Sequence, residues 1–317
     1  MASVPVSVRR RAVRELQRQV DATRPVLRAN AIEMLRYEIE PLRKAVLEGF
    51  RDPNEGVRFA SLMTAGRAGL CGVAPAARSL MEDSSASVRA AAIFLLATCG
   101  EPVDQTSLAQ MILSDDRTTR TNAAMVLGEI GNPTAKPLLR EAMQRPLPLE
   151  DEEVIRATEL MLAEALVQLG DRRQLEAIRA AFFAPASQSG LTALASQMAG
   201  RLQDRTLIPA MGALALSDGP RKAGPELRLI AAEAVARMDS ELTLTDLAVS
   251  FSENQSPEVR MQAAAVLAWG MRQQGLDTLK QLLNDDHPRV RIAAAGAILS
   301  RAAAVAGRRP PGSSFEN

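Results

Sequence analysis

The chain has 317 residues, of which 47% are hydrophobic but only 3% aromatic, a composition that favours helix pairs with thin Ala, Leu, Val and Met seams over one large core. The formal net charge of +1 conceals basic ends and an acidic middle. Two cysteines exclude a metal cluster or a disulfide framework, and no run of about 18 uncharged apolar residues marks a membrane span. We therefore expect a soluble cytoplasmic protein in which Cys71 and Cys99 are small core residues.

The chain begins with a basic segment that contains Arg9, Arg10, Arg11, Arg14 and Arg18. Such a segment could contact the phosphates of a nucleic acid. The alternative is a solvated first helix that caps an array of repeats, which such arrays require for solubility. We expect the second role, so a nucleic acid is not the expected partner.

One sequence phrase recurs through the chain, an arginine followed by alanines and other apolar residues at helical spacing. Eight copies carry the arginine, which is Arg28, Arg58, Arg89, Arg120, Arg156, Arg228, Arg260 and Arg291, and a ninth, degenerate copy has Thr192 in its place. Shorter amphipathic segments lie between the copies, at residues 41–50, 73–81, 108–113, 135–143, 175–183, 207–216, 242–251 and 276–283. The pattern predicts about nine helical hairpins that bury their apolar faces against one another.

These copies resemble HEAT repeats, and in particular the short bacterial kind named after phycobilisome lyases, with the pattern D-x-x-x-x-V-R-x-x-A-A-x-x-L-x-x-L-G. The resemblance covers nearly the whole chain and implies an all-α fold, an α-α superhelix of the HEAT/armadillo-like α-solenoid type. Residues 1–306 would form this single solenoid. Stacked helices about 8–10 Å apart would then give an elongated, curved body roughly 80 Å long.

In that family an aspartate six residues before the arginine bonds along the stack. Asp52, Asp83 and Asp285 stand at this position before Arg58, Arg89 and Arg291. The resemblance therefore implies a structural ladder in which each arginine, Arg89 included, meets a turn carboxylate. The residues of this ladder are Asp52, Arg58, Asp83, Arg89, Arg120, Arg156, Arg228, Arg260, Asp285 and Arg291.

Two connections, at residues 144–148 and 217–225, are longer than a repeat needs and flank the degenerate copy. Their prolines and glycines predict a change of curvature and a hinge near residues 184–225. The last segment, residues 307–317, has turn formers and no periodicity, so we expect a disordered tail.

Residues that could carry chemistry are sparse. His287 is the only histidine, in a turn before Pro288, so we expect no catalytic residue, no metal and no cofactor. The HEAT-like deoxyhypusine hydroxylases hold iron through His-Glu pairs, which this sequence lacks. The HEAT-like alkylpurine glycosylases gather several aromatic residues, but seven repeats separate Tyr37 from Trp269, so we expect no single pocket to contain both. A bilin-lyase-like or other ligand-handling enzyme subunit, acting for example on a tetrapyrrole, stays an alternative.

A stripe of large apolar residues stands five positions after the arginine in four consecutive repeats, at Met63, Phe94, Met125 and Met161. By the helical step this position borders the exposed side of the second helix. Such residues suit a groove for an apolar partner, although packing between neighbouring helices is an alternative. We expect a non-catalytic scaffold that binds a segment of another protein or a peptide on its concave surface.

Overall fold

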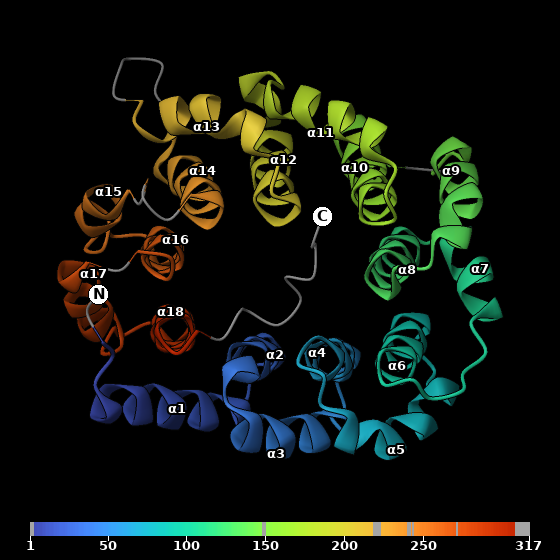
Figure 1. Ribbon diagram of the computed structural model, residues 1–317, viewed down its shortest axis with the longest axis horizontal. Helices are drawn as coiled ribbons and strands as arrows, with labels where there is room; N and C mark the ends of the chain where they lie inside the picture. The colour runs from blue at the N-terminus through green and yellow to red at the C-terminus, as the bar shows by residue number, and fades with distance from the viewer. Residues whose placement is uncertain are drawn as a thin grey trace.

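The structure, a computed structural model, describes residues 3–147, 150–217, 223–239, 242, 244–270 and 272–307. Within these residues it has eighteen α-helices and no strand. They form nine hairpins, as the repeat pattern predicts, and each hairpin pairs an outer helix with an inner helix (Figure 1). The degenerate copy forms a hairpin as well.

The outer helices come first in each hairpin. They are α1 (Val6–Val20), α3 (Ile39–Gly49), α5 (Ala74–Ala77), α7 (Thr106–Ile112), α9 (Lys136–Gln144), α11 (Leu175–Phe182), α13 (Ile208–Ala215), α15 (Thr245–Ser250) and α17 (Gln273–Leu282). The inner helices are α2 (Pro25–Met34), α4 (Glu55–Arg67), α6 (Ala86–Thr98), α8 (Arg117–Ile130), α10 (Glu152–Gln168), α12 (Ser189–Leu202), α14 (Pro225–Met238), α16 (Pro257–Leu267) and α18 (Pro288–Val305). Short 3₁₀ turns extend several of them, namely η1 (Leu35–Tyr37), η2 (Cys71–Val73), η3 (Arg78–Glu82), η4 (Pro133–Ala135), η5 (Arg172–Gln174), η6 (Ala186–Gln188) and η7 (Arg205–Leu207).

The inner helices begin and end at residues suited to these positions. Proline stands in the first turn of α2, α14, α16 and α18, where a missing N–H costs nothing. The side chains of Asn54, Asp116 and Asp151 cap α4, α8 and α10 by accepting from the third backbone N–H. Gly131 ends α8 with a φ of 76°, a conformation that glycine adopts without strain.

The array closes on itself. Helix α1 packs against both α2 and α18, and α18 also packs against α2, so the first and ninth hairpins are neighbours in space. Figure 1 shows the nine inner helices arranged around a centre with the outer helices behind them. The expected elongated body is therefore wrong. The first helix packs on the last repeat instead of capping an open end. Its arginines Arg10, Arg11, Arg14 and Arg18 are exposed, as expected for a solvated helix.

A buried carboxylate lies at the junction. Glu15 of α1 is 8% exposed and accepts hydrogen bonds from Arg291 Nε at 2.8 Å and Gln19 Nε2 at 2.9 Å, and it pairs with Arg18. Tyr37 donates from its hydroxyl to Ser300 Oγ at 3.3 Å. A side chain at Gly296 would collide with Met34, so the glycine allows α18 and α2 to approach closely.

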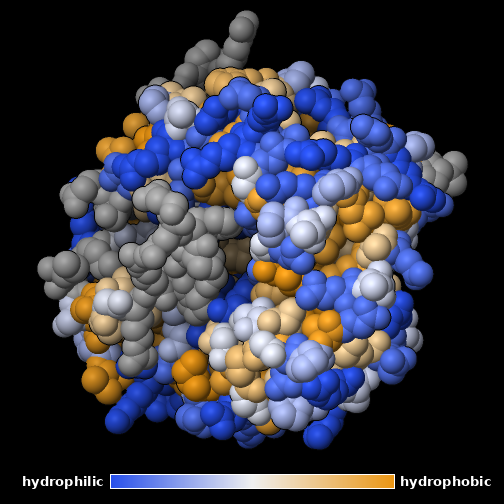
Figure 2. All heavy atoms as spheres, turned by 45° about the vertical axis from the view of Figure 1, so that its right-hand side comes forward, coloured by the Kyte–Doolittle hydropathy of each residue, from blue (hydrophilic) through white to orange (hydrophobic). Residues whose placement is uncertain are grey.

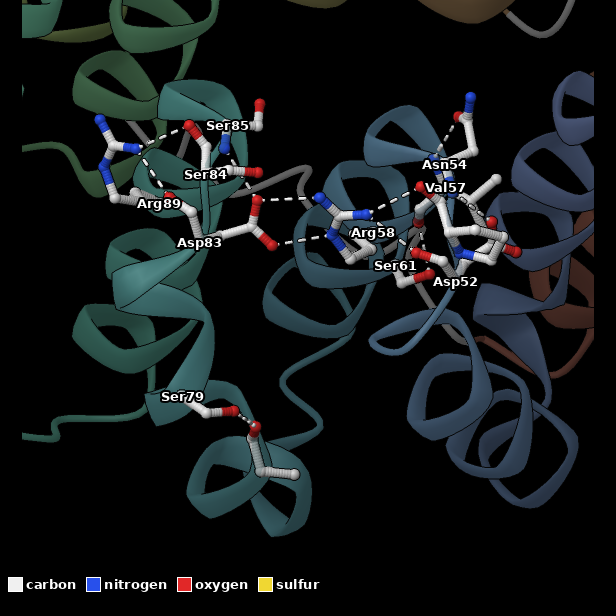
Figure 3. Close-up of polar contacts among 12 residues, drawn as sticks. Asp52, Asn54, Val57, Arg58, Ser61, Ser79, Asp83, Ser84, Ser85 and Arg89 are labelled. Atoms are coloured by element: carbon white, nitrogen blue, oxygen red, sulfur yellow. Dashed lines mark hydrogen bonds and ion pairs between the residues drawn. The ribbon is translucent and has the colours of Figure 1, made fainter.

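The Arg58–Asp83 pair shows how neighbouring repeats are tied. Arg58 Nε and Nη2 donate to the two oxygens of Asp83 in the next repeat at 2.8 and 2.9 Å, and Arg58 Nη1 donates to the backbone oxygens of Asp52 and Pro53 in its own turn (Figure 3). Asp83 also accepts from the backbone N–H of Ser85 at 2.9 Å. One guanidinium thus joins two successive turns.

The same paired geometry joins Arg28 to Asp52 and Arg260 to Asp285. These pairs confirm that turn aspartates bond along the stack. At Arg291 the stack has no further repeat, and Glu15 takes the place of the aspartate. The ladder therefore continues across the junction.

Among the described residues, four predicted ladder arginines have no hydrogen bond to a carboxylate. Arg89 donates to the backbone oxygens of Asp83 and Ser84, and Ser114 stands at the turn position where the next repeat would carry aspartate. The expected carboxylate partner of Arg89 is therefore wrong.

The other three arginines use different acceptors. Arg120 is 1% exposed and donates to the backbone oxygens of Ser114 and Arg145, with an Asp115 oxygen 3.9 Å away. Arg156 donates to Gln188 Oε1, and Arg228 to the backbone oxygen of Ala215. Turn carbonyls and an amide thus replace the carboxylate in the middle of the chain.

The ladder aspartates are ionised in the folded protein. Burial alone would raise the pKa of Asp83, but the hydrogen bonds from Arg58 and from the Ser85 N–H, with the charges of Arg58 and Arg89, hold that pKa below 3.8. The same balance lowers the pKa values of Asp52 and Asp285. Each paired aspartate therefore stabilises the fold at pH values above the ordinary pKa of aspartate. This stabilisation is lost as the pH falls through the lowered pKa of the folded state.

Arg58 and Arg89 offer a matched test of the ladder, because both donate to two carbonyls of their own turn and only Arg58 holds a carboxylate. Arg58→Ala leaves Asp83, whose side chain is 8% exposed, without its partner, so we expect a loss of about 2–4 kcal/mol of unfolding free energy. Arg89→Ala removes hydrogen bonds to two neutral carbonyl oxygens and should cost about 1 kcal/mol. Urea melts of both variants measure the difference, and equal losses would contradict the ladder's role.

A disulfide joins Cys71 to Cys99, with 5.3 Å between their Cα atoms. Cys71 lies at the start of the third hairpin and Cys99 caps its inner helix α6, so the bond links the two ends of one hairpin. The expectation of two unpaired core cysteines is wrong. Disulfides are typical of oxidising compartments, so the cysteines do not support the cytoplasmic location expected from the sequence.

Reduction should destabilise the protein without dismantling it. The bond closes a loop with a sequence separation of 28, for which chain entropy predicts a contribution of about 2–4 kcal/mol. We expect a reductant to lower the thermal midpoint of the wild type and to leave a Cys71→Ser, Cys99→Ser double variant unchanged. If the reductant leaves the thermal midpoint of the wild type unchanged, the disulfide does not stabilise the fold.

The sixth hairpin has a tie that the sequence pattern missed. Thr192 replaces the ladder arginine, but Arg179 of the outer helix α11 donates to both oxygens of Asp204 at 2.8 and 2.9 Å. Asp204 is 6% exposed and precedes the next outer helix. The hinge near residues 184–225 stays a prediction, and residues 218–222 of that segment, residue 148 of the earlier connection and residues 308–317 of the expected tail lie outside the described residues.

Candidate functional site at the centre of the ring

The inner helices present two sequence positions toward the centre. Counted from the ladder residue of each repeat, these are the fifth and the ninth, which lie four residues apart and therefore on one helix face. We call the residues at or beside these positions the central face: Glu33, Arg36, Tyr37, Arg67, Met125, Glu129, Met161, Glu164, Arg201, Glu233, Arg237 and Trp269. Figure 2 shows that the surface is hollowed near its middle and carries hydrophilic and hydrophobic residues side by side.

Arg67 connects three inner helices. Its Nε donates to Glu129 Oε2 of α8 at 2.9 Å, its Nη1 lies 3.9 Å from Glu33 of α2, and its Nη2 approaches Met125 Sδ at 3.4 Å. Burial lowers the pKa of Arg67, but the hydrogen bond to Glu129 and the charges of Glu129, Glu33 and Glu164 raise it above the ordinary value. The arginine is held in its charged form and spans the intervening helix α6.

Arg201 makes a second pair in the same region. Its Nε and Nη2 donate to the two oxygens of Glu164 at 2.7 and 2.9 Å, which joins α12 to α10. Burial lowers the pKa of Arg201, but the hydrogen bond to Glu164 and the charges of Glu164 and Glu233 together raise that pKa above its ordinary value, against a small opposing effect of the Arg67 charge. Arg67 and Arg201 belong to the second and sixth hairpins, so the charge of one arginine acts on another four hairpins away.

Two arginines of the central face stack on aromatic rings. Arg36 lies 5.1 Å from the ring centre of Tyr37, and Arg237 lies 5.2 Å from that of Trp269, whose Nε1–H donates to Glu233 at 3.4 Å. Tyr37 and Arg36 both affect the pKa of Arg237. Ring closure leaves one hairpin, the ninth, between those of Tyr37 and Trp269. The expectation that no single pocket contains both residues stays a prediction.

The apolar stripe is only partly accessible. Met63 and Phe94 are 2% and 3% exposed, and Phe94 fills the space beside Gly66 on the adjacent inner helix. Both therefore pack between helices, and the prediction that they border an exposed surface is wrong. Met125 and Met161 are partly exposed, so half of the stripe reaches the central face.

The side chains of the site suit recognition through charge and stacking. Among the described residues, no three or more His, Cys, Asp or Glu side chains gather in a way that could hold a metal ion. His287 lies in the turn before α18, as predicted, and its Nδ1 is buried. No helix in the described ranges combines the length and apolarity needed to cross a membrane.

Sequence reasoning found the fifth position through its methionines but missed most of the charged residues. Arg67, Glu129, Arg201 and Arg237 each stand nine residues after the ladder position, as Tyr37 and Trp269 do. The recurrence of large polar and aromatic residues at the ninth position is visible when the repeats are aligned. That these residues face a common centre follows only from ring closure, which the alignment does not show.

Comparison with known protein families supports the repeat assignment. Residues 74–162 and 245–304 match the sequence model of HEAT repeats. No curated protein matches the chain.

Similar solved structures include two engineered proteins and human deoxyhypusine hydroxylase in complex with glycerol, each 16% identical to this chain. For one engineered protein the TM-score is 0.37 and the alignment covers 63% of this chain and 99% of that chain. For the other the TM-score is 0.34, with 94% and 92% covered. For the hydroxylase the TM-score is 0.37, with 86% and 96% covered.

Proposed function

Because this chain is a HEAT-repeat protein whose hairpins close into a ring, we propose that it is a non-catalytic scaffold that holds a segment of a partner protein at its central face. The observation that carries the proposal is the convergence of accessible methionine, tryptophan and paired charged groups from many repeats on one region. Large apolar side chains with surrounding charged residues are typical of binding surfaces. HEAT repeats supply the rigid frame.

The shape of the central face favours an extended segment as partner. Arg67 reaches from α4 to Glu129 of α8, and its charge acts on Arg201 of α12. A region crossed by such contacts suits a single narrow chain rather than a folded domain. Met125 and Met161 would contact apolar side chains of this segment, while the neighbouring arginines and glutamates would pair with its polar groups.

Met161 and Met143 provide a test with an internal control. Both are partly buried methionines, but Met161 lies on the inner helix α10 and Met143 on the outer helix α9. A photo-crosslinking residue at position 161 should form an adduct with a discrete partner in the native cell, and the same residue at position 143 should not. Mass spectrometry identifies the partner, and a peptide of the crosslinked segment should bind the purified ring.

The competing outcomes are distinct. Adducts at both positions, or at position 143 alone, would place binding on the outer helices and contradict a central site. Visible absorbance of the purified protein would instead favour the ligand-handling alternative. Circular dichroism melts establish that each labelled variant is folded before the crosslinking is interpreted.

A further inference from the structure

A hollow of about 620 Å³ lies where the first helix meets the last turn, and we call it the junction hollow. Helix α1 forms one wall, with Arg11, Arg14, Glu15 and Arg18. These four residues share one helix face, because they follow the spacing of three and four residues that a helix repeats. Residues 283–286 and Arg291 form the other wall. The hollow therefore exists only when the ring is closed.

Two of the carboxylates in the junction hollow are already bonded to arginines. Glu15 accepts from Arg291 Nε at 2.8 Å and pairs with Arg18. Asp285 accepts from Nε and Nη2 of Arg260 at 2.7 and 2.9 Å. Neither carboxylate is therefore available to neutralise a further guanidinium group.

Two arginines of the α1 wall have no carboxylate partner. Arg11 Nη2 donates to the neutral amide oxygen of Asn284. Arg14 is exposed and makes no hydrogen bond and no ion pair through its side chain within the described residues. The same is true of the side chain of Asp286, on the opposite wall. The junction hollow thus holds two available guanidinium groups and one available carboxylate.

The basic wall is not a general property of the repeat turns. A second hollow, of about 490 Å³, lies between the eighth and ninth hairpins and shares residues 284–286 with the junction hollow. Its other wall contains Glu253, and the one arginine in its lining, Arg260, is bonded to Asp285. The ladder across the junction needs only Glu15 as acceptor, so closure through the ladder does not explain Arg11 and Arg14.

We propose that the junction hollow binds a phosphorylated small molecule that also carries hydroxyl groups, of the class of a sugar phosphate. Arg11 and Arg14 donate charge-assisted hydrogen bonds to the phosphate oxygens. Asp286 accepts hydrogen bonds from the hydroxyl groups, which a ligand made of phosphate alone could not supply. The volume lies within the range of small-molecule sites, about 300–1,000 Å³.

The site is separate from the central face. Arg291 lies in the first turn of α18, and the turn of the junction hollow precedes that helix. Arg67 and Arg201 of the central face lie instead at the carboxyl ends of α4 and α12. The proposal is therefore independent of the scaffold function. Because both ends of the chain line the hollow, a bound ligand should favour the closed ring.

Ribose 5-phosphate is a suitable probe, because it carries both groups that the site would recognise. It is titrated into the full-length protein at constant ionic strength, maintained with sodium chloride, in a calorimeter. We expect saturable binding and a raised thermal midpoint. Ribose and inorganic phosphate, which each carry one of the two groups, should bind more weakly.

Arg14 and Arg10 provide a matched pair of variants. Both are exposed arginines of α1, but Arg10 lies outside the junction hollow. Arg14→Gln should weaken the binding of ribose 5-phosphate about ten-fold, because it removes a charge-assisted donor. Arg10→Gln removes the same charge and should bind as the wild type does. The thermal midpoint of unligated Arg14→Gln should match that of the wild type, since Arg14 has no partner to lose.

Asp286→Ala tests the hydroxyl contact. It should weaken the binding of ribose 5-phosphate and should not weaken that of inorganic phosphate, which has no sugar hydroxyls. The proposal is overturned if ribose 5-phosphate shows no saturable binding to the wild type. It is also overturned if Arg14→Gln and Arg10→Gln weaken binding equally, which would reduce the effect to the general charge of α1, or if inorganic phosphate binds as tightly as ribose 5-phosphate.

Discussion

The structure depends on the burial of Glu15 against Arg291. In each regular repeat the arginine donates to its own turn and to an aspartate of the next turn, so the last arginine of an open array would lack its carboxylate. Glu15 supplies that carboxylate from the first helix. A buried arginine or glutamate left alone is strongly destabilising. Because the two residues are 276 positions apart, their pairing requires that the nine hairpins turn through a full circle.

Closure changes what the concave surface of the solenoid can do. In an open arc the inner helices would line a broad groove, and residues from the first and eighth repeats would never meet. In the ring they surround a centre where the charge of Arg67 acts on Arg201 and the charge of Arg36 acts on Arg237. The same constraint removes the exposed terminal repeat that an open array would have to cap with polar residues.

Much of the fold could be predicted from the sequence, because each hairpin is local and its pattern repeats. The arginine phrase fixes the inner helices, the apolar segments between them fix the outer helices, and the turn aspartates give three of the ladder pairs. Closure could not be predicted, because it sums small angles between neighbouring hairpins and depends on Glu15, which belongs to no periodic pattern. The Cys71–Cys99 bond joins two ends of one hairpin, a proximity that composition alone does not reveal.

The candidate site was predictable only in part for the same reason. Repeat alignment places Met125 and Met161 at the edge of the inner helices, and both reach the central face. It places Met63 and Phe94 at the same position, yet the close approach of α4 and α6 beside Gly66 buries them. Local packing density between particular helices, rather than helical phase, decides which of these residues is accessible.

The distance between α1 and the last turn tests closure most directly. Spin labels on cysteines introduced at Arg14 and Asp286, which line the same hollow at the junction, can be measured by double electron–electron resonance while the native cysteines remain paired. The closed ring predicts one narrow distribution, at the spacing of packed helices of about 10 Å plus the reach of the label arms. A distribution centred several tens of Å away, as nine hairpins in an open arc would give, would contradict closure.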